Sequence, residues 1–177
     1  SIMSELRTNR IVPRDGLPSG SSGGIIQIKS ATKTDRQLSN SSAYVDVTGM
    51  SVSITPTRSD SKIFIMINVH VGGDQASYLA FRVLRDSTVV TQGTHATGNR
   101  TNVSFGGRID QDYDNYMMSF NFLDSPSTTS ATTYKLQVSD AYDSANRNIV
   151  INGTGDDAND TYTLCGTSTI TVMEVTG

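Results

Sequence analysis

The chain has 177 residues and a formal net charge of −3, and 18% of its residues are charged. This length suits one domain with a small appendage, and the chain lacks the basic stripe of a protein that binds nucleic acid. No apolar run approaches the about 20 residues of a membrane-spanning helix, so we expect no membrane insertion, and no secretory signal is recognisable.

Residues 1–23 differ in character from the rest of the chain. They combine the turn-forming Pro13 and Asp15-Gly16 with a Gly- and Ser-rich joint around residues 20–24. Their few apolar residues cannot stabilise a fold alone. The segment is therefore either a floppy tail or a short extended arm that orders against another chain. In the second case the attachment residues are Leu6, Arg7, Arg10, Ile11, Val12 and Arg14.

Residues 24–177 have the pattern of a β domain. The hydrophobic content of the whole chain is only 36%. The apolar residues of this part nevertheless gather in alternating β-branched runs, which favours strands over disorder. Residues 36–42 are expected to form a polar loop, and Gly49 a turn or bulge. No helical periodicity occurs, so the chain is predicted to be all-β, with eight to ten strands in an antiparallel sandwich, jelly roll or barrel. The candidate strand segments, of which the shortest need not all form strands, are 25–34, 44–47, 50–55, 62–71, 78–85, 89–91, 103–105, 116–123, 134–138, 149–151 and 167–175.

The longest apolar run, residues 62–71, has two different faces. Every second residue from Ile63 to Val71 is Ile or Val, which predicts a core face. The other face begins with apolar residues and ends with Asn68 and His70. Several strands share this two-sided character, which indicates either scattered surface hydrophobics or a sheet face buried by neighbouring subunits. Under the second interpretation the contact residues are Phe64, Met66, Met117 and Met173.

Residue types that carry chemistry are few. No motif places the histidines or Cys165 in a catalytic triad or a zinc site, and we expect Cys165 to be a buried small hydrophobe. The alternating Asp110, Asp112 and Asp114 resemble the start of an EF-hand loop, but Asn121 stands where the final Glu is required. They are weak metal candidates, and a solvated turn is the other interpretation. We therefore expect no enzyme activity and no cofactor.

Several segments together resemble the tail-fibre-like proteins of bacteriophages, especially marine phages. They are residues 6–18 (LRTNRIVPRDGLP), 44–52 (YVDVTGMSV), 61–63 (SKI), 83–86 (VLRD), 122–126 (FLDSP), 134–137 (YKLQ) and 168–174 (STITVME). The resemblance implies a homotrimeric virion protein with a jelly-roll-like head at 24–177 and an arm at 1–23 that attaches to other virion proteins or trimerises.

The resemblance also implies that loops of the head contact a host surface glycan or protein. Loops on a rigid scaffold commonly carry recognition, and aromatic side chains are suited to stacking on sugars. Two alternatives remain open: a capsid decoration protein with the same trimeric head, and a calcium-dependent carbohydrate-binding module. The receptor-loop candidates are Tyr78, His95, Tyr113 and Tyr162.

Overall fold

The computed structural model describes residues 24–142 and 147–175. The expected boundary between arm and head therefore stays a prediction. The expected attachment residues, which are Leu6, Arg7, Arg10, Ile11, Val12 and Arg14, lie outside the described residues.

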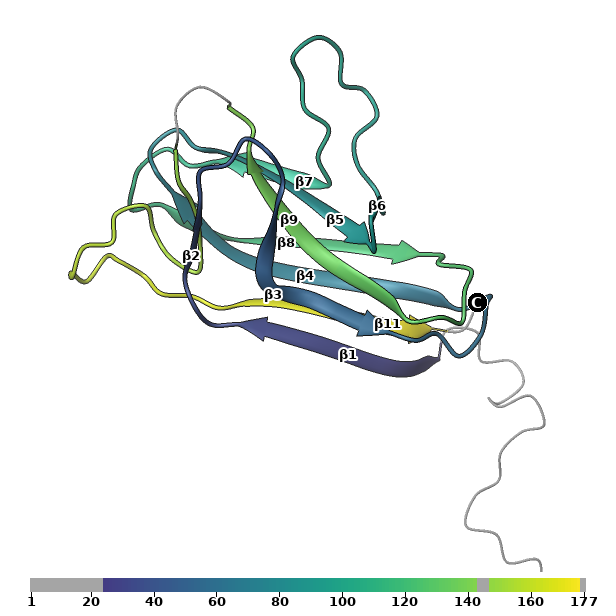
Figure 1. Ribbon diagram of the computed structural model, residues 1–177. Coiled ribbons are helices and arrows are strands. Elements are labelled where there is room, and N and C mark those ends of the chain that lie inside the picture. Colours follow the sequence, from purple (N-terminus) through teal and green to yellow (C-terminus); the bar gives the residue numbers. More distant parts are fainter. Residues whose placement is uncertain (1–23, 143–146, 176–177) are drawn as a thin grey trace, which may run out of the picture.

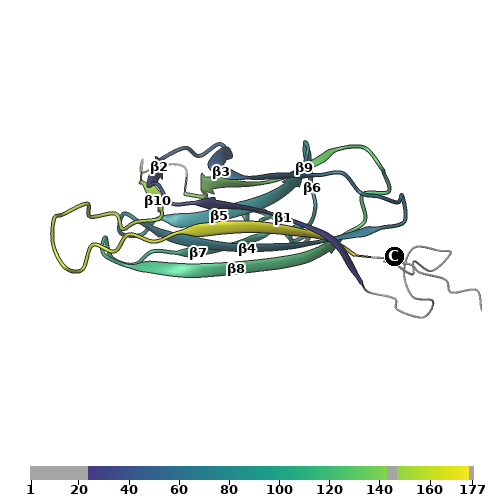
Figure 2. The ribbon, with the colours of Figure 1, turned by 90° about the horizontal axis from the view of Figure 1, so that it is seen from below.

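The described residues form eleven strands and no helix, as expected for an all-β chain. The strands make two antiparallel sheets that pack face to face as a β-sandwich (Figure 1 and Figure 2). In chain order they are β1 (Ile25–Lys33), β2 (Gln37–Ser39), β3 (Val45–Ile54), β4 (Lys62–Gly73), β5 (Tyr78–Arg85), β6 (Thr88–Val89), β7 (Phe105–Arg108), β8 (Asn115–Asp124), β9 (Thr132–Asp140), β10 (Ile149–Ile151) and β11 (Ser168–Val175).

The eight longer strands follow the order of a jelly roll. The first sheet runs β1-β11-β4-β8, and the second runs β3-β9-β5-β7. This is the double Greek-key arrangement of an eight-stranded jelly roll. Short strands β10 and β2 extend the first sheet beyond the end of β11, and β6 pairs with the end of β5. The predicted antiparallel, jelly-roll-like sandwich is confirmed, with three short strands in addition to the eight.

Rows of β-branched residues facing between the sheets build the core. On β4, the alternate residues from Ile63 to Val71 are all buried, as predicted. The neighbouring β11 adds Ile170 and Val172, and β9 in the opposite sheet adds Leu136. Each such side chain contributes about 1.5–3 kcal/mol when it is fully buried. The side chains that alternate in the sequence therefore stabilise the sandwich by being buried between its sheets.

Two segments differ in detail from the sequence prediction. The expected strands 44–47 and 50–55 are one strand, β3, because Gly49 takes a φ of 81° where the pairing with β9 shifts between Asp46 and Ser51. The expected loop 36–42 contains strand β2, which pairs with β10. That strand has only three residues, Gln37, Leu38 and Ser39, which is too short for an alternating pattern to indicate a strand.

A column of aromatic rings joins the two sheets along one side. Phe81 of β5 stacks on Phe105 of β7 with ring centroids 4.8 Å apart. Phe105 in turn stacks on Phe120 of β8, in the other sheet, at 5.4 Å. Strands β7 and β8 lie at the edges of the two sheets. The stacked rings therefore hold the two sheets together along this edge of the sandwich.

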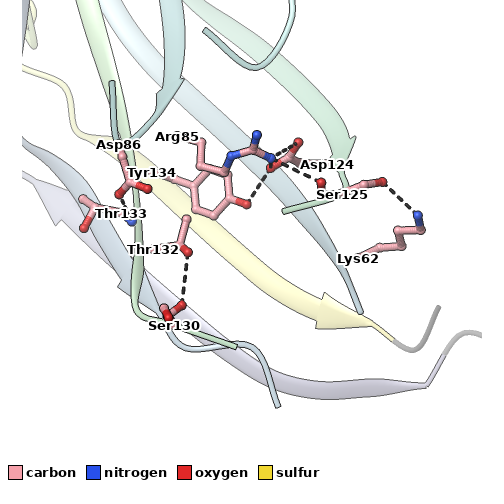
Figure 3. A network of polar contacts seen from close by, with 9 residues as sticks. All are labelled: Lys62, Arg85, Asp86, Asp124, Ser125, Ser130, Thr132, Thr133 and Tyr134. Carbon is pink, nitrogen blue, oxygen red and sulfur yellow. Dashed lines mark hydrogen bonds and ion pairs between the residues drawn. The ribbon is translucent and has the colours of Figure 1, made fainter. Parts of the chain in front are cut away.

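A polar cluster links the sheets near the end of β8 (Figure 3). Arg85 of β5 donates from Nη1 to both carboxylate oxygens of Asp124, at 3.0 and 2.8 Å, and Tyr134 of β9 donates its hydroxyl to Oδ2 at 2.7 Å. Asp124 is only 7% exposed. Burial, aided by the hydrogen bond to Asp124, raises the pKa of the Tyr134 hydroxyl well above its usual value. The buried carboxylate thus depends on both donors.

Glu174 forms a second buried polar contact, at the end of β11. The side chain of Gln27 donates to one carboxylate oxygen at 2.6 Å, and the backbone N and hydroxyl of Thr57 donate to the other, each at 2.7 Å. Burial alone would raise the pKa of this carboxyl, but the hydrogen bonds outweigh it and hold the pKa below the ordinary 4.5. Glu174 therefore anchors the connection after β3 to the first sheet.

We expect the Glu174→Gln variant to lose stability at neutral pH but little in acid. A folded pKa below the unfolded value stabilises the protein above the unfolded pKa, and this contribution is lost as the pH falls through the folded pKa. Chemical denaturation near neutral pH should show a loss of about 1–3 kcal/mol, and the gap to the unsubstituted protein should narrow as the pH falls below 4.5. A gap that is independent of pH would contradict this role.

No helix in the part of the chain that the structure describes is long and apolar enough to cross a membrane.

Candidate interaction surfaces

The outer face of the first sheet carries a row of apolar side chains, two of them exposed and two half-buried. Strand register places Ile28 of β1 directly opposite Met173 of β11. It places Phe64 of β4 between Met173 and Leu123 of β8. Directly opposed residues of antiparallel strands project from the same face, so these side chains cross four strands in one line. Ile28 and Leu123 are 53% and 51% exposed. We call these four residues the apolar row.

Further apolar side chains flank the apolar row. Met66 follows Phe64 by two residues on the same face of β4 and is exposed. On the other side, Ile25 pairs with Val175 and is also exposed. A contiguous apolar patch of this kind marks an interaction site in soluble proteins, whereas scattered apolar residues do not.

The opposite half of the same sheet face is polar. There, the Ser119 hydroxyl donates to Asn68 Oδ1 across β8 and β4 at 2.7 Å. Met117 lies in this half and is exposed, but about 20 Å of extended strand separates it from Leu123. Of the four residues expected at a subunit contact, the strand register brings together Phe64, Met66 and Met173. Met117 lies apart from them.

The sequence prediction did not identify three members of the patch, which are Ile25, Ile28 and Leu123. Alternation along β8 is sufficient to place Leu123 outward, because Phe120 and Phe122 pack against the core. The positions of the β1 and β11 residues depend on pairing between distant segments, which no local pattern encodes.

The two ends of the sandwich carry different parts of the chain (Figure 1). The described chain begins at Gly24, directly before β1, and ends at Val175, on the side of the molecule where the apolar row lies. The connections 109–114 and 152–167 lie at the opposite end, the second of them drawn in yellow. Residues 1–23 therefore join the domain beside the apolar row and far from these connections.

Hydrogen bonds tie the connections at the far end to one another. The amide of Asp156 donates to the carbonyl of Asp112 at 2.9 Å, and the amide of Gln75 donates to the Asp112 carboxylate. The backbone and side-chain nitrogens of Asn148 both donate to Asp74 Oδ2, at 2.8 and 2.9 Å. Loops that are held in this way form a defined surface on a rigid scaffold, which suits recognition.

Three of the four expected receptor-loop residues lie at this far end. Tyr113 and Tyr162 project into solvent from connections 109–114 and 152–167. Tyr78 stacks with Tyr142 at a centroid distance of 5.5 Å. Asp140 Oδ1 accepts hydrogen bonds from the backbone N of both stacked tyrosines, at 3.4 and 3.1 Å, and so holds them side by side.

The three candidate metal ligands each interact with a different part of their loop. Asp110 forms an ion pair with Arg108 at 2.5 Å. Asp114 Oδ2 accepts a hydrogen bond from the backbone N of Gln111 at 3.0 Å, and Asp112 accepts one from a neighbouring loop. Within residues 24–142 and 147–175, no group of three His, Cys, Asp or Glu side chains is arranged to hold a metal ion. These carboxylates organise the loop.

His70 and Cys165 differ in exposure. The 152–167 connection packs on the His70 side chain, whereas Cys165, which belongs to that connection, is exposed. His70 Nε2 is 2.9 Å from Asn115 Oδ1. Gly166 packs so closely on the imidazole that an added Cβ would lie 2.3 Å from His70 Cγ. The prediction that Cys165 is buried is wrong, because it belongs to a surface connection and not to strand β11.

The fourth receptor-loop candidate, His95, lies in the connection between β6 and β7, which projects from the side of the sandwich (Figure 1). This connection contains a solvent-open hollow of about 550 Å³, within the range of ligand pockets. His95 lines it together with Arg100 and Asn102. The structure thus places His95 apart from the three tyrosines, on a separate surface.

No protein-family model and no curated protein matches the chain. Among solved structures, the chain is similar to a protein in the structure of infectious bursal disease virus Gt strain, with 13% identity and a TM-score of 0.46 over 97% of this chain and 43% of that one. The structure of the Gx strain of the same virus gives 15% identity and a TM-score of 0.45, over 97% of this chain and 47% of that one. The crystal structure of the VP2 subviral particle of infectious bursal disease virus gives 12% identity and a TM-score of 0.41, over 97% of this chain and 46% of that one. The chain spans less than half the length of each, and the likeness concerns the fold alone.

Proposed function

We propose that the chain is a non-enzymatic structural protein of a virus particle, a tail fibre or similar appendage that assembles as a homotrimer. Residues 1–23 attach it to other virion proteins, and the loops at the far end face the host surface. The apolar row on the outer face of the first sheet carries the proposal. The sequence resemblance to phage tail-fibre-like proteins supplies the virion context.

The apolar row favours contact with further copies of the chain. Where the outer face of an antiparallel sheet meets water, its strands carry apolar residues on the inner face and polar residues on the outer face. The half of the outer face around Asn68 and Ser119 is polar, as this rule requires. The half around Phe64 is not. A face that is apolar at one end only suits subunits that meet at that end and diverge at the other. Met66 and Met173 suit such a contact because methionine adapts its shape to its partner.

The location of the apolar row also fits an attached protein. The row lies at the end where Gly24 connects the domain to residues 1–23. Attachment and subunit contact would then occupy one end of the sandwich, and the hydrogen-bonded loops with Tyr113 and Tyr162 would occupy the other. This separation leaves the loops free to contact a host glycan or protein.

Light scattering on the 177-residue chain tests the trimer. We expect a mass three times 19.0 kDa at micromolar concentration. The double variant Ile28→Glu/Met66→Glu places charges in and beside the apolar row and should yield monomers, because buried unpaired charges oppose association. Thr32→Glu/Ser119→Glu is the matched control, since it adds the same charge to the polar half of the same face.

A monomeric unsubstituted chain would contradict the trimer, and so would two double variants with equal effects. Retained β-sheet circular dichroism in both variants ensures that dissociation and not unfolding is measured. A density map of an intact particle then tests the attachment. Density for the sandwich on a tail or fibre supports the proposed role, whereas density on the capsid shell would indicate a decoration protein instead.

A further inference from the structure

The connection between β6 and β7 is anchored at its base. The amide of Gly93 donates to the carbonyl of Val103 at 3.1 Å, and the amide of Ser104 donates to the carbonyl of Phe81 in the core at 2.8 Å. The Ser104 hydroxyl donates to the carbonyl of Thr91 at 2.6 Å. These contacts cross-link the two arms of the connection, so the hollow of about 550 Å³ between them is part of the folded structure.

Polar side chains converge over Gly93 inside this hollow. A Cβ added to Gly93 would lie 3.7 Å from Asn102 Oδ1 and 3.8 Å from His95 Nδ1. Arg100, Thr101 and Ser104 add further polar groups, and Ala96 and Val103 contribute apolar surface to the lining. Among the residues that the structure describes, none forms a hydrogen bond or ion pair with the side chains of His95, Arg100 or Asn102. Their donors and acceptors are therefore available to a ligand.

The charge of this connection is opposite to that of the chain. Residues 91–104 contain no Asp or Glu, although the whole chain has 17 acidic and 14 basic residues. Arg100 contributes a fixed positive charge, and its planar guanidinium matches the two oxygens of a carboxylate. The Asn102 amide, the Thr101 hydroxyl and the His95 imidazole suit hydroxyl groups. The polar groups thus fit a small molecule that carries one carboxylate and several hydroxyls, and Ala96 and Val103 offer apolar surface to the C–H groups of its ring.

We propose that this hollow binds a hexuronic acid residue of a surface polysaccharide. Arg100 pairs with the carboxylate, and Asn102 and His95 form hydrogen bonds with ring hydroxyls. The inference rests on the proposed function in one respect: the polysaccharide is taken to belong to the surface of the host. The site lies within one chain and is separate from both the apolar row and the far-end tyrosines.

Titration followed by NMR amide shifts tests the site, with D-galacturonate and D-glucuronate as probes and neutral D-galactose and D-glucose as matched controls. We expect a uronate to shift the signals of residues 93–104, and the neutral sugars to bind at least about tenfold more weakly, since a charge-assisted pair is lost. Arg100→Gln should weaken uronate binding by a similar factor. Lys29→Gln removes the same charge from β1, outside the hollow, and should leave binding unchanged.

Three outcomes would overturn the inference: no shift with either uronate, equal affinity for uronate and neutral sugar, or equal affinity of Arg100→Gln and the unsubstituted chain. Repeating the titration on Ile28→Glu/Met66→Glu separates this inference from the proposed trimer. Uronate binding by monomers supports the hollow whatever the oligomeric state. A trimer that binds no uronate overturns the hollow alone, and a monomeric unsubstituted chain that binds uronate overturns the trimer alone.

Discussion

Replacing Asp124 with Ala is expected to lower the free energy of unfolding by about 3–5 kcal/mol. The substitution leaves the half-buried guanidinium of Arg85 and the buried hydroxyl of Tyr134 without the carboxylate to which both donate. These groups come from β5 and β9, whereas Asp124 ends β8 in the other sheet, so the contact between the sheets is lost as well. Urea unfolding, monitored by circular dichroism, measures the change. The slope of the free energy of unfolding against urea concentration should stay the same.

Two further variants identify the source of the Asp124 effect. Tyr134→Phe removes one donor and leaves the ion pair, so it should cost about 1–2 kcal/mol. Asp110→Ala breaks the solvent-exposed pair with Arg108, and exposed pairs contribute about 0–1 kcal/mol. If Asp124→Ala cost no more than Asp110→Ala, the buried cluster would have no structural role.

Replacing Phe81 with Ala is expected to destabilise the protein by about 3–5 kcal/mol. Phe81 is fully buried and begins the ring column that passes through Phe105 to Phe120. Truncation leaves a cavity and removes the surface on which Phe105 stacks, and aromatic pairs add about 0.5–1.5 kcal/mol beyond burial. Because the column joins edge strands of both sheets, hydrogen exchange of β7 and β8 amides should accelerate in this variant.

Tyr113→Ala is the matched control for Phe81→Ala. It removes an aromatic ring of similar size from an exposed loop position, so its effect on stability should stay within about 0.5 kcal/mol. A Phe81→Ala variant as stable as this control would show that the ring column does not hold the sheets together.

Much of the fold follows from local pattern. The alternation of Ile63 to Val71 predicts both a strand and its buried face, because period-2 spacing places every second side chain on one side. Gly49 predicts the irregularity in β3, because its positive φ is unfavourable for other residues. Strand β2 could not be predicted, because its three residues, only one of which is apolar, acquire strand geometry only by pairing with β10.

Burial of polar groups is less predictable. Glu174 sits in an alternating strand where a charged residue ordinarily faces solvent, yet it is 0% exposed. It tolerates burial because Gln27 and Thr57, both distant in sequence, supply three hydrogen bonds. Cys165 shows the reverse: its apolar character favours the core, but its loop runs over the surface.

By itself, the sequence determined that this protein is all-β, that residues 62–71 form a strand with one buried face, and that the second face of this strand changes from apolar to polar. These properties depend on residue types at fixed local spacing. Only the tertiary structure decided that Ile28, Met173, Phe64 and Leu123 form one row, that Met117 lies apart from it, and that His95 faces a hollow with Arg100 and Asn102. The physical reason is register: pairing between strands distant in the chain sets which side chains become neighbours, and local spacing carries no information about it.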